Sequence, residues 1–237
     1  MTSNLPPRLA AIDLGTNTFR LVTRGLQMVE YPRIGIGVDK TGRIAAASIR
    51  RGMAGLAKFA RVVRSRRLKI VGVVGTSALR DASNGAGFCD AVRRRFGWDV
   101  QIISGDDEAT LTFLGATASL KLPARGTILI SDVGGGSTEL IWGSSGKILG
   151  RVSLKLGSVR MTERYRTSGR STPRKIATIR HAVRTILRSA TVPWGKIETV
   201  VGVGGTATTL AAILHGVEPY DDKQVHGSAV PLDSMEK

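Results

Sequence analysis

Cysteine, aromatic residues and acids are all scarce in this sequence. Its one cysteine, Cys89, excludes an intrachain disulfide and argues against a metal site built from cysteines. No apolar run approaches the roughly 20 residues that a membrane-spanning helix needs. The first eight residues are polar and hold no apolar secretory core, so we expect a cytoplasmic protein with no membrane partner.

The shortage of acids leaves a strong positive charge. Thirty-five lysines and arginines face 18 acids, a formal net charge of +17, which favours a polyanionic partner; charge that merely keeps the chain soluble is the alternative. No helix-turn-helix or zinc pattern is visible, so a specific nucleic-acid partner is not expected. Arginines of the first predicted helix are expected to help bind a long polyanion: Arg61, Arg64 and Arg67.

Strands alternate with helices along the chain, which predicts an α/β fold with mainly buried strands. Strands are predicted at 10–13, 19–23, 70–74, 100–103, 127–131, 138–142, 148–153 and 199–203. Helices are predicted at 46–67, 84–96, 107–118, 173–190 and from about 206 to 214. The first helix carries an apolar stripe of Ile49, Met53, Leu56, Ala60 and Val63. Residues 24–36 look like a trimmed strand-and-loop region.

One sequence pattern occurs twice. Residues 12–18 (IDLGTNT) resemble residues 131–138 (SDVGGGST): each is a strand that ends in aspartate, then a glycine, small hydroxyl residues and a second strand. One copy lies in each half of the chain. The repetition predicts two similar domains, residues 1–123 and 124–237, that face each other across a cleft and meet at a hinge near 121–126.

The glycine loops predict a phosphate site. A strand–glycine–strand turn exposes several backbone N–H groups, and glycine lets the backbone approach a phosphate closely. A third glycine loop, at 202–206, adds to the two hairpin loops. Candidate phosphate-binding residues are Gly15, Thr16, Asn17, Gly134, Gly135, Gly136, Ser137, Thr138, Gly204, Gly205 and Thr206. Candidate metal ligands are Asp13, Asp132 and Glu139.

Glu108 is the candidate for acid–base work. It follows a strand and the Ser104-Gly105 turn, at the head of a predicted helix where a carboxylate can face a cleft and polarise a water. The alternative is a helix-capping cluster running from Ser104 to Glu108. The local sequence leaves both readings open.

Six motifs in order resemble those of the exopolyphosphatase / guanosine pentaphosphate phosphohydrolase family, within the actin, sugar kinase and heat-shock chaperone ATPase superfamily. They cover nearly the whole chain, from about residue 10 to residue 226. They are AIDLGTNTFR (11–20), GTSALRDA (75–82), ISGDDEA (103–109), DVGGGSTE (132–139), LGSVR (156–160) and VGGT (203–206). The resemblance implies two actin-like (ribonuclease H-like) domains.

The resemblance also implies a Mg²⁺-dependent phosphohydrolase that acts on inorganic polyphosphate or guanosine pentaphosphate. Glu108 matches the catalytic base, while Asp132 and Glu139 match metal and water partners. Arg20 and Arg80 resemble arginines that neutralise phosphate charge. No aromatic cluster offers a base pocket, which favours polyphosphate.

The sequence departs from the family at two places. Asp107 stands where a glutamate is usual, and little effect is expected because Glu108 is kept. The family continues beyond the match at residues 225–227, so the second domain is expected to be incomplete, and apolar surface left open there would favour a homodimer. Two alternatives follow: a catalytically impaired, polyanion-binding fragment, and a kinase of the same superfamily.

Overall fold

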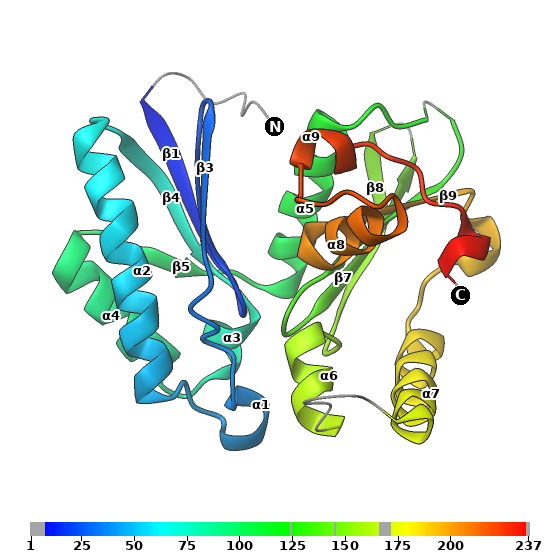
Figure 1. Ribbon diagram of the computed structural model, residues 1–237, viewed down its shortest axis with the longest axis horizontal. Helices are drawn as coiled ribbons and strands as arrows, with labels where there is room; N and C mark the ends of the chain where they lie inside the picture. The colour runs from blue at the N-terminus through cyan, green and yellow to red at the C-terminus, as the bar shows by residue number, and fades with distance from the viewer. Residues whose placement is uncertain (1–7, 124, 145, 166–171, 236–237) are drawn as a thin grey trace.

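The computed structural model describes residues 8–123, 125–144, 146–165 and 172–235. Most of the N-terminal segment and the last two residues lie outside these ranges, as does Ala124 in the predicted hinge. Two sheets lie side by side, each with its own helices (Figure 1). The structure is therefore α/β with two halves, as the alternation of strands and helices predicts.

The first sheet has the order β3-β2-β1-β4-β5. Its strands are β1 (Leu9–Leu14), β2 (Phe19–Thr23), β3 (Leu26–Glu30), β4 (Lys69–Gly75) and β5 (Val100–Ile102). The first three are antiparallel, whereas β4 and β5 run parallel to β1. The helices of this half are α1 (Val38–Thr41), α2 (Ala46–Ser65), α3 (Ser77–Asp81) and α4 (Gly85–Phe96).

The second sheet has the order β8-β7-β6-β9. Its strands are β6 (Ile128–Val133), β7 (Thr138–Ser144), β8 (Lys147–Leu154) and β9 (Thr199–Val203). Three antiparallel strands are again followed by a parallel one, so the two halves share a topology. The helices of this half are α5 (Gly105–Ser119), α6 (Ser158–Tyr165), α7 (Pro173–Ser189), α8 (Gly204–Leu214) and α9 (Asp222–Val225), with short 3-10 turns at Trp194–Lys196 and Leu232–Met235.

Helix α5 packs on the second sheet. Phe113 of α5 shares a buried cluster with Ile130 and Ile141 of that sheet. The chain thus crosses between the halves just after β5, where the Ile103 amide still bonds to the Gly75 carbonyl of the first sheet. The domain boundary at residue 123 stays a prediction. Helix α5, which precedes this boundary in the sequence, packs with the second half.

Most predicted elements are found within a few residues of their expected bounds, and two expectations are wrong. Residues 24–36 are not trimmed, because β3 pairs with β2 over five residues. β4 is not buried throughout, since Val71 is 52% exposed. The apolar stripe of α2 does face the core, where Leu56 is fully buried and Ile49 and Met53 pack against the cluster. Gly52 and Gly55 lie beside this stripe and let Phe88 and Glu30 come close.

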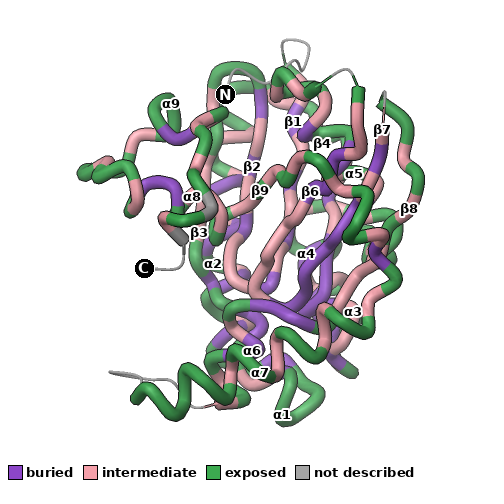
Figure 2. The backbone as a smooth tube through the Cα atoms, turned by 90° about the vertical axis from the view of Figure 1, so that its right-hand side faces the viewer, coloured by how far each residue is buried: buried purple, intermediate pink, exposed green. Residues whose placement is uncertain are grey.

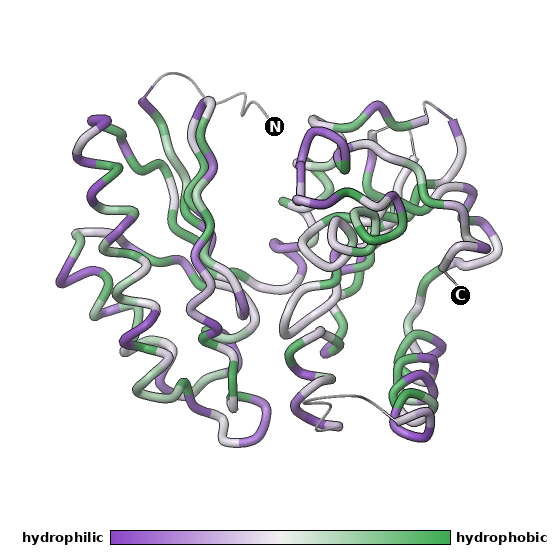
Figure 3. Tube along the Cα trace, viewed as in Figure 1, coloured by the Kyte–Doolittle hydropathy of each residue, from purple (hydrophilic) through white to green (hydrophobic). Residues whose placement is uncertain are grey.

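The helix α7 contacts the core of the second half near its C-terminal end, where Leu187 packs against the cluster of Leu129 and Leu140. None of its residues is buried (Figure 2), and apolar and polar residues alternate along it (Figure 3). No helix in the described part of the chain is long and apolar enough to cross a membrane.

Candidate active site

The first glycine loop is a tight turn between β1 and β2. The Gly15 amide donates to the Thr18 carbonyl over 2.9 Å, and the carbonyls of Thr16 and Asn17 accept from the amides of Gly35 and Arg33. The loop's carbonyl groups are thus largely engaged by the protein itself. Its side of the cleft is left with backbone N–H groups and the Thr16 and Asn17 side chains.

The second glycine loop, between β6 and β7, repeats this turn. The Gly134 amide donates to the Ser137 carbonyl over 3.0 Å. The Gly134 carbonyl accepts from the Ser158 amide, and the Gly135 carbonyl accepts from the Val159 and Arg160 amides at the start of α6. In the described part of the chain, the Gly135 and Gly136 amides have no hydrogen-bond acceptor. They are free to bind an anion.

The two loops touch across the cleft. A Cβ atom on Gly135 would lie 3.2 Å from the Cβ of Thr16, and one on Gly136 would lie 2.5 Å from the Ser77 hydroxyl oxygen. Glycine is required at Gly136 because the opposite half comes this close.

The third glycine loop joins them from the start of α8. Gly204 has a φ of 78°, and a Cβ there would lie 2.3 Å from an Asp132 carboxylate oxygen. The hydroxyl group of Thr206 donates to the Val133 carbonyl, and that of Thr138 donates to the Leu156 carbonyl. All three predicted phosphate loops therefore meet at one point, although these two hydroxyls bond within the second half.

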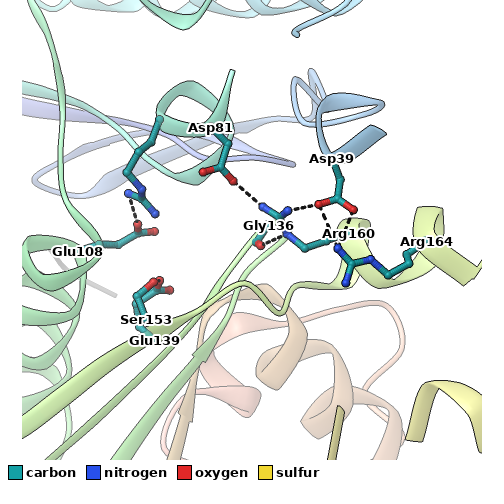
Figure 4. Close-up of polar contacts among 9 residues, drawn as sticks. Asp39, Asp81, Glu108, Gly136, Glu139, Ser153, Arg160 and Arg164 are labelled. Atoms are coloured by element: carbon teal, nitrogen blue, oxygen red, sulfur yellow. Dashed lines mark hydrogen bonds and ion pairs between the residues drawn. The ribbon is translucent and has the colours of Figure 1, made fainter. Parts of the chain in front are cut away.

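Glu108 faces the cleft from the first turn of α5, where Arg80 of α3 approaches it (Figure 4). An Arg80 nitrogen lies 3.3 Å from a Glu108 oxygen and 2.7 Å from the Ile103 carbonyl. The capping role belongs to other residues, because the Ser104 hydroxyl accepts from the Asp107 amide and donates to the Asp107 carboxylate. Helix capping by Ser104 and Asp107 therefore leaves the Glu108 side chain available for another role.

Two further carboxylates lie opposite each other on the second hairpin. The register pairs Asp132 with Glu139. Glu139 is only 1% exposed and accepts a 2.7 Å hydrogen bond from the Ser153 hydroxyl. In the first hairpin the same register pairs Asp13 with Arg20, and these two form an ion pair of 3.5 Å.

Crowding of these carboxylates raises their pKa values. Burial and the neighbouring charge of Glu139 raise the pKa of Glu108 to about 8, against the opposing effect of Arg80. The same two causes raise the pKa of Asp132 to about 6. Burial also raises the pKa of Glu139 and of Asp13. Buried like charges disfavour full ionisation, so the cluster would gain from a cation.

The described residues form no group of three acidic, histidine or cysteine side chains that could hold a metal ion. Mg²⁺ commonly binds through one or two carboxylates together with substrate phosphates and water. The acidic, oxygen-only chemistry around Asp132 fits such a site. The roles predicted for Asp13, Asp132 and Glu139 as metal ligands stay predictions.

A cleft of about 490 Å³ opens beside the carboxylates. Three basic residues line it: Arg80, Arg151 and Lys155. Helix α2, by contrast, lies on the outer side of the first sheet, away from the second half (Figure 1), so the expectation that its arginines serve a ligand of this cleft finds no support. Sequence reasoning missed Ser153, Arg151 and Lys155, because they belong to no motif.

Comparisons with known proteins agree with this geometry. A profile of the Ppx/GppA phosphatase family matches residues 15–237. Exopolyphosphatase 2 of Mycobacterium tuberculosis is 36% identical over 94% of this chain and 76% of its own length. A guanosine-5'-triphosphate,3'-diphosphate pyrophosphatase of Aliivibrio fischeri is 30% identical over 90% of this chain and 45% of its own length.

A solved structure shares the whole fold. The crystal structure of an exopolyphosphatase-like protein superposes with a TM-score of 0.89, at 36% identity, over 95% of this chain and 75% of its own. The profile, the sequence relatives and the solved structure all point to one family. The chain belongs to the Ppx/GppA phosphatase family and is a hydrolase.

Proposed function

We propose that this chain is an exopolyphosphatase-type phosphohydrolase that releases terminal phosphate from inorganic polyphosphate. The observation that carries the proposal is the placement of Glu108, Asp132 and Glu139 beside two glycine loops that touch across the cleft. The loops offer N–H groups for the terminal phosphate, and the carboxylates offer an acceptor for a proton of water.

The chemistry is a displacement at phosphorus. Glu108 as carboxylate takes a proton from a water molecule, the water oxygen forms a bond to the terminal phosphorus, and the P–O bond to the next phosphate breaks. Orthophosphate and a chain shorter by one unit result. Arg20 and Arg80 stabilise charge on the phosphate oxygens. Bound Mg²⁺, held by Asp132, would supply further charge neutralisation.

Polyphosphate is favoured over guanosine pentaphosphate by the lining of the neighbouring cleft. Arg151 and Lys155 add positive charge beyond Arg80, where further phosphates of a chain would lie; Asp81 and Asp106 line the same cleft, and Asp106 pairs with Arg151 over 3.5 Å. None of the described residues that line this cleft is aromatic, so a stacking surface for a guanine base is missing there. The name of the M. tuberculosis relative supports this substrate, whereas the name of the A. fischeri relative supports guanosine pentaphosphate.

A catalytically impaired, polyanion-binding fragment is not supported. The three carboxylates and both arginines that the resemblance implies are present and lie close enough to affect one another's pKa values.

The test is phosphate release from long-chain polyphosphate by the purified chain, with and without Mg²⁺. We expect Mg²⁺-dependent release, a loss of about 10²–10⁴-fold in kcat in Glu108→Gln, and retained polyphosphate binding in that variant. Arg93→Gln is the control, since Arg93 lies on the exposed surface of the first half, where it pairs with Asp99. Near-normal turnover by Glu108→Gln would refute the assignment of the base. Faster release from guanosine pentaphosphate would refute the preferred substrate.

A further inference from the structure

Arg160, in the LGSVR motif of the second half, has no part in the proposed chemistry. It lies on α6 and is buried, with 8% of the residue exposed. An arginine in such a place needs partners for its charge and its donors, because burying an uncompensated charge is costly. Its contacts therefore show what it does.

The guanidinium group makes three contacts with three separate segments (Figure 4). Its Nε donates to the Gly136 carbonyl of the second glycine loop over 2.7 Å. One terminal nitrogen lies 2.6 Å from a carboxylate oxygen of Asp81, and the other pairs with Asp39. Asp81 ends α3 and Asp39 lies in α1, so both acids belong to the first half.

The neighbouring residues of α6 strengthen the same junction. The Gly37 amide, at the start of α1, donates to both carboxylate oxygens of Glu163 over 2.8 and 3.0 Å. Arg164 adds an exposed ion pair with Asp39. The cavity left between the halves at this point is only about 10 Å³. We call this junction, made by α1, α3 and α6, the seam.

We propose that Arg160 is a positioning residue that couples closure of the two halves to the shape of the second phosphate loop. The Gly136 carbonyl is held by the same planar group that binds Asp39 and Asp81. If the halves separate, the guanidinium loses both counter-ions and its fixed orientation, and the Gly136 carbonyl loses its donor. The amides of Gly135 and Gly136 would then no longer be held toward one point.

A lysine could not replace this arginine. Arginine presents several N–H donors in one rigid plane, whereas lysine carries a single compact ammonium group. One ammonium group can satisfy only part of the contacts with Gly136, Asp39 and Asp81. The proposal rests on the proposed function only where it takes the second loop to bind phosphate.

The experiment measures hydrogen exchange and turnover in the same variants. In Arg160→Met we expect amide exchange to become at least tenfold faster in residues 37–42 of the first half and in the loop 134–137. Exchange in the last turn of α4, away from the start of that helix beside α3, should stay unchanged. We expect kcat for polyphosphate to fall about 10- to 100-fold through misplacement of the loop, with a smaller change in KM. In Arg160→Lys, both the exchange rates and kcat should lie between those of wild type and those of Arg160→Met.

The control is Arg93→Gln, which also removes one arginine charge; Arg93 lies near the end of α4 and pairs with the exposed Asp99. Unchanged exchange in residues 37–42 would overturn the coupling between the halves. Faster exchange there with unchanged kcat would overturn the positioning role. Faster exchange throughout the chain, α4 included, would also overturn the proposal, because it would show a general loss of stability.

Asp81→Asn tests the same idea from the first half if Arg160→Met does not fold. Its side chain is 22% exposed, so the substitution is milder, and we expect the same pattern at smaller size. The exchange measurement needs no turnover. If the proposed function failed, the exchange rates would still decide whether the seam couples the two halves.

Discussion

At the scale of single residues, the cleft is defined by carboxylates that cannot all be ionised in the free protein. The pKa of Glu108 is about 8 and that of Asp132 about 6, because burial and the nearby charge of Glu139 raise both. Arg80, the partner of Glu108, reduces the pKa shift of Glu108 without cancelling it. The protein thus holds a protonated glutamate at neutral pH until a cation or substrate changes its surroundings.

The pH dependence of the free energy of unfolding should reveal the proton on Glu108. Folding raises the pKa of Glu108 above its ordinary value of 4.5 to about 8, so the unfolded chain releases the proton first as pH rises. The contribution of Glu108 to the free energy of unfolding is fully present below about pH 4.5 and lost by about pH 8. Relative to Glu108→Gln, wild type should lose on the order of 5 kcal/mol over this range.

Thermal unfolding of both proteins across pH 4.5–8, without divalent ions, measures the difference. A constant difference in Tm would contradict the raised pKa. Adding Mg²⁺ at pH 8 should raise the Tm of wild type more than that of the variant, if the ion binds beside the ionised carboxylates.

At the scale of elements, α5 and β8 meet at a contact that tolerates no extra atom. A Cβ atom on Gly105 would lie 2.5 Å from the Cβ of Ser153. Ser153 also donates a hydrogen bond to Glu139. The contact therefore sets the distance between the first turn of α5, which carries Glu108, and the second sheet.

Gly105→Ala should therefore destabilise the protein by about 1–3 kcal/mol through overpacking, although alanine is the better helix former. Urea unfolding measures the change. The matched control is Gly115→Ala in the same helix, where a Cβ meets no atom within 4 Å and a small gain is expected. Equal effects at the two glycines would refute the contact.

The basic residues of β8 and α2 offer a second comparison between elements. Arg151 of β8 lines the cleft with Lys155, which follows that strand, whereas Arg61 and Arg64 lie on the outer helix. Arg151→Gln with Lys155→Gln should raise KM for long-chain polyphosphate at least fivefold. Arg61→Gln with Arg64→Gln, a change of equal charge, should leave KM within twofold. A larger rise in KM in the α2 double variant than in the β8 double variant would show that polyphosphate binds across the outer face of the first half.

The sequence predicts an element well when the conformation of that element is set by residues close together in the chain. Local patterns are enough for β1, β2 and the glycine turns, because alternation, glycine and the terminal aspartate act over a few residues. They also predict the face of α2 that packs on the core, but they miss the buried Gly52 and Gly55, which make close packing possible without carrying an apolar side chain. Arg160 stands in a recognised motif, yet its partners Asp39 and Asp81 lie 121 and 79 positions away, and only the fold brings them together.

At the scale of the whole molecule, the net charge of +17 predicts strong dependence on salt. Screening shortens the reach of exposed charges from about 10 Å at 0.1 M to about 3 Å at 1 M ionic strength. KM for long-chain polyphosphate should therefore rise more than tenfold over this range, while kcat changes little. Tripolyphosphate should show a smaller rise, since it contacts fewer basic residues. Equal rises for both substrates would argue against a long-range effect of charge.

The paired hairpins have one more consequence. Seven positions after its strand-terminal aspartate, the first hairpin carries Arg20 and the second carries Glu139, at the same place in the same register. The two hairpins share their strand pairing, and this exchange of sign distinguishes them. Where one copy of the turn carries an arginine the other carries a glutamate, so the two copies present opposite side-chain charges to whatever lies between them.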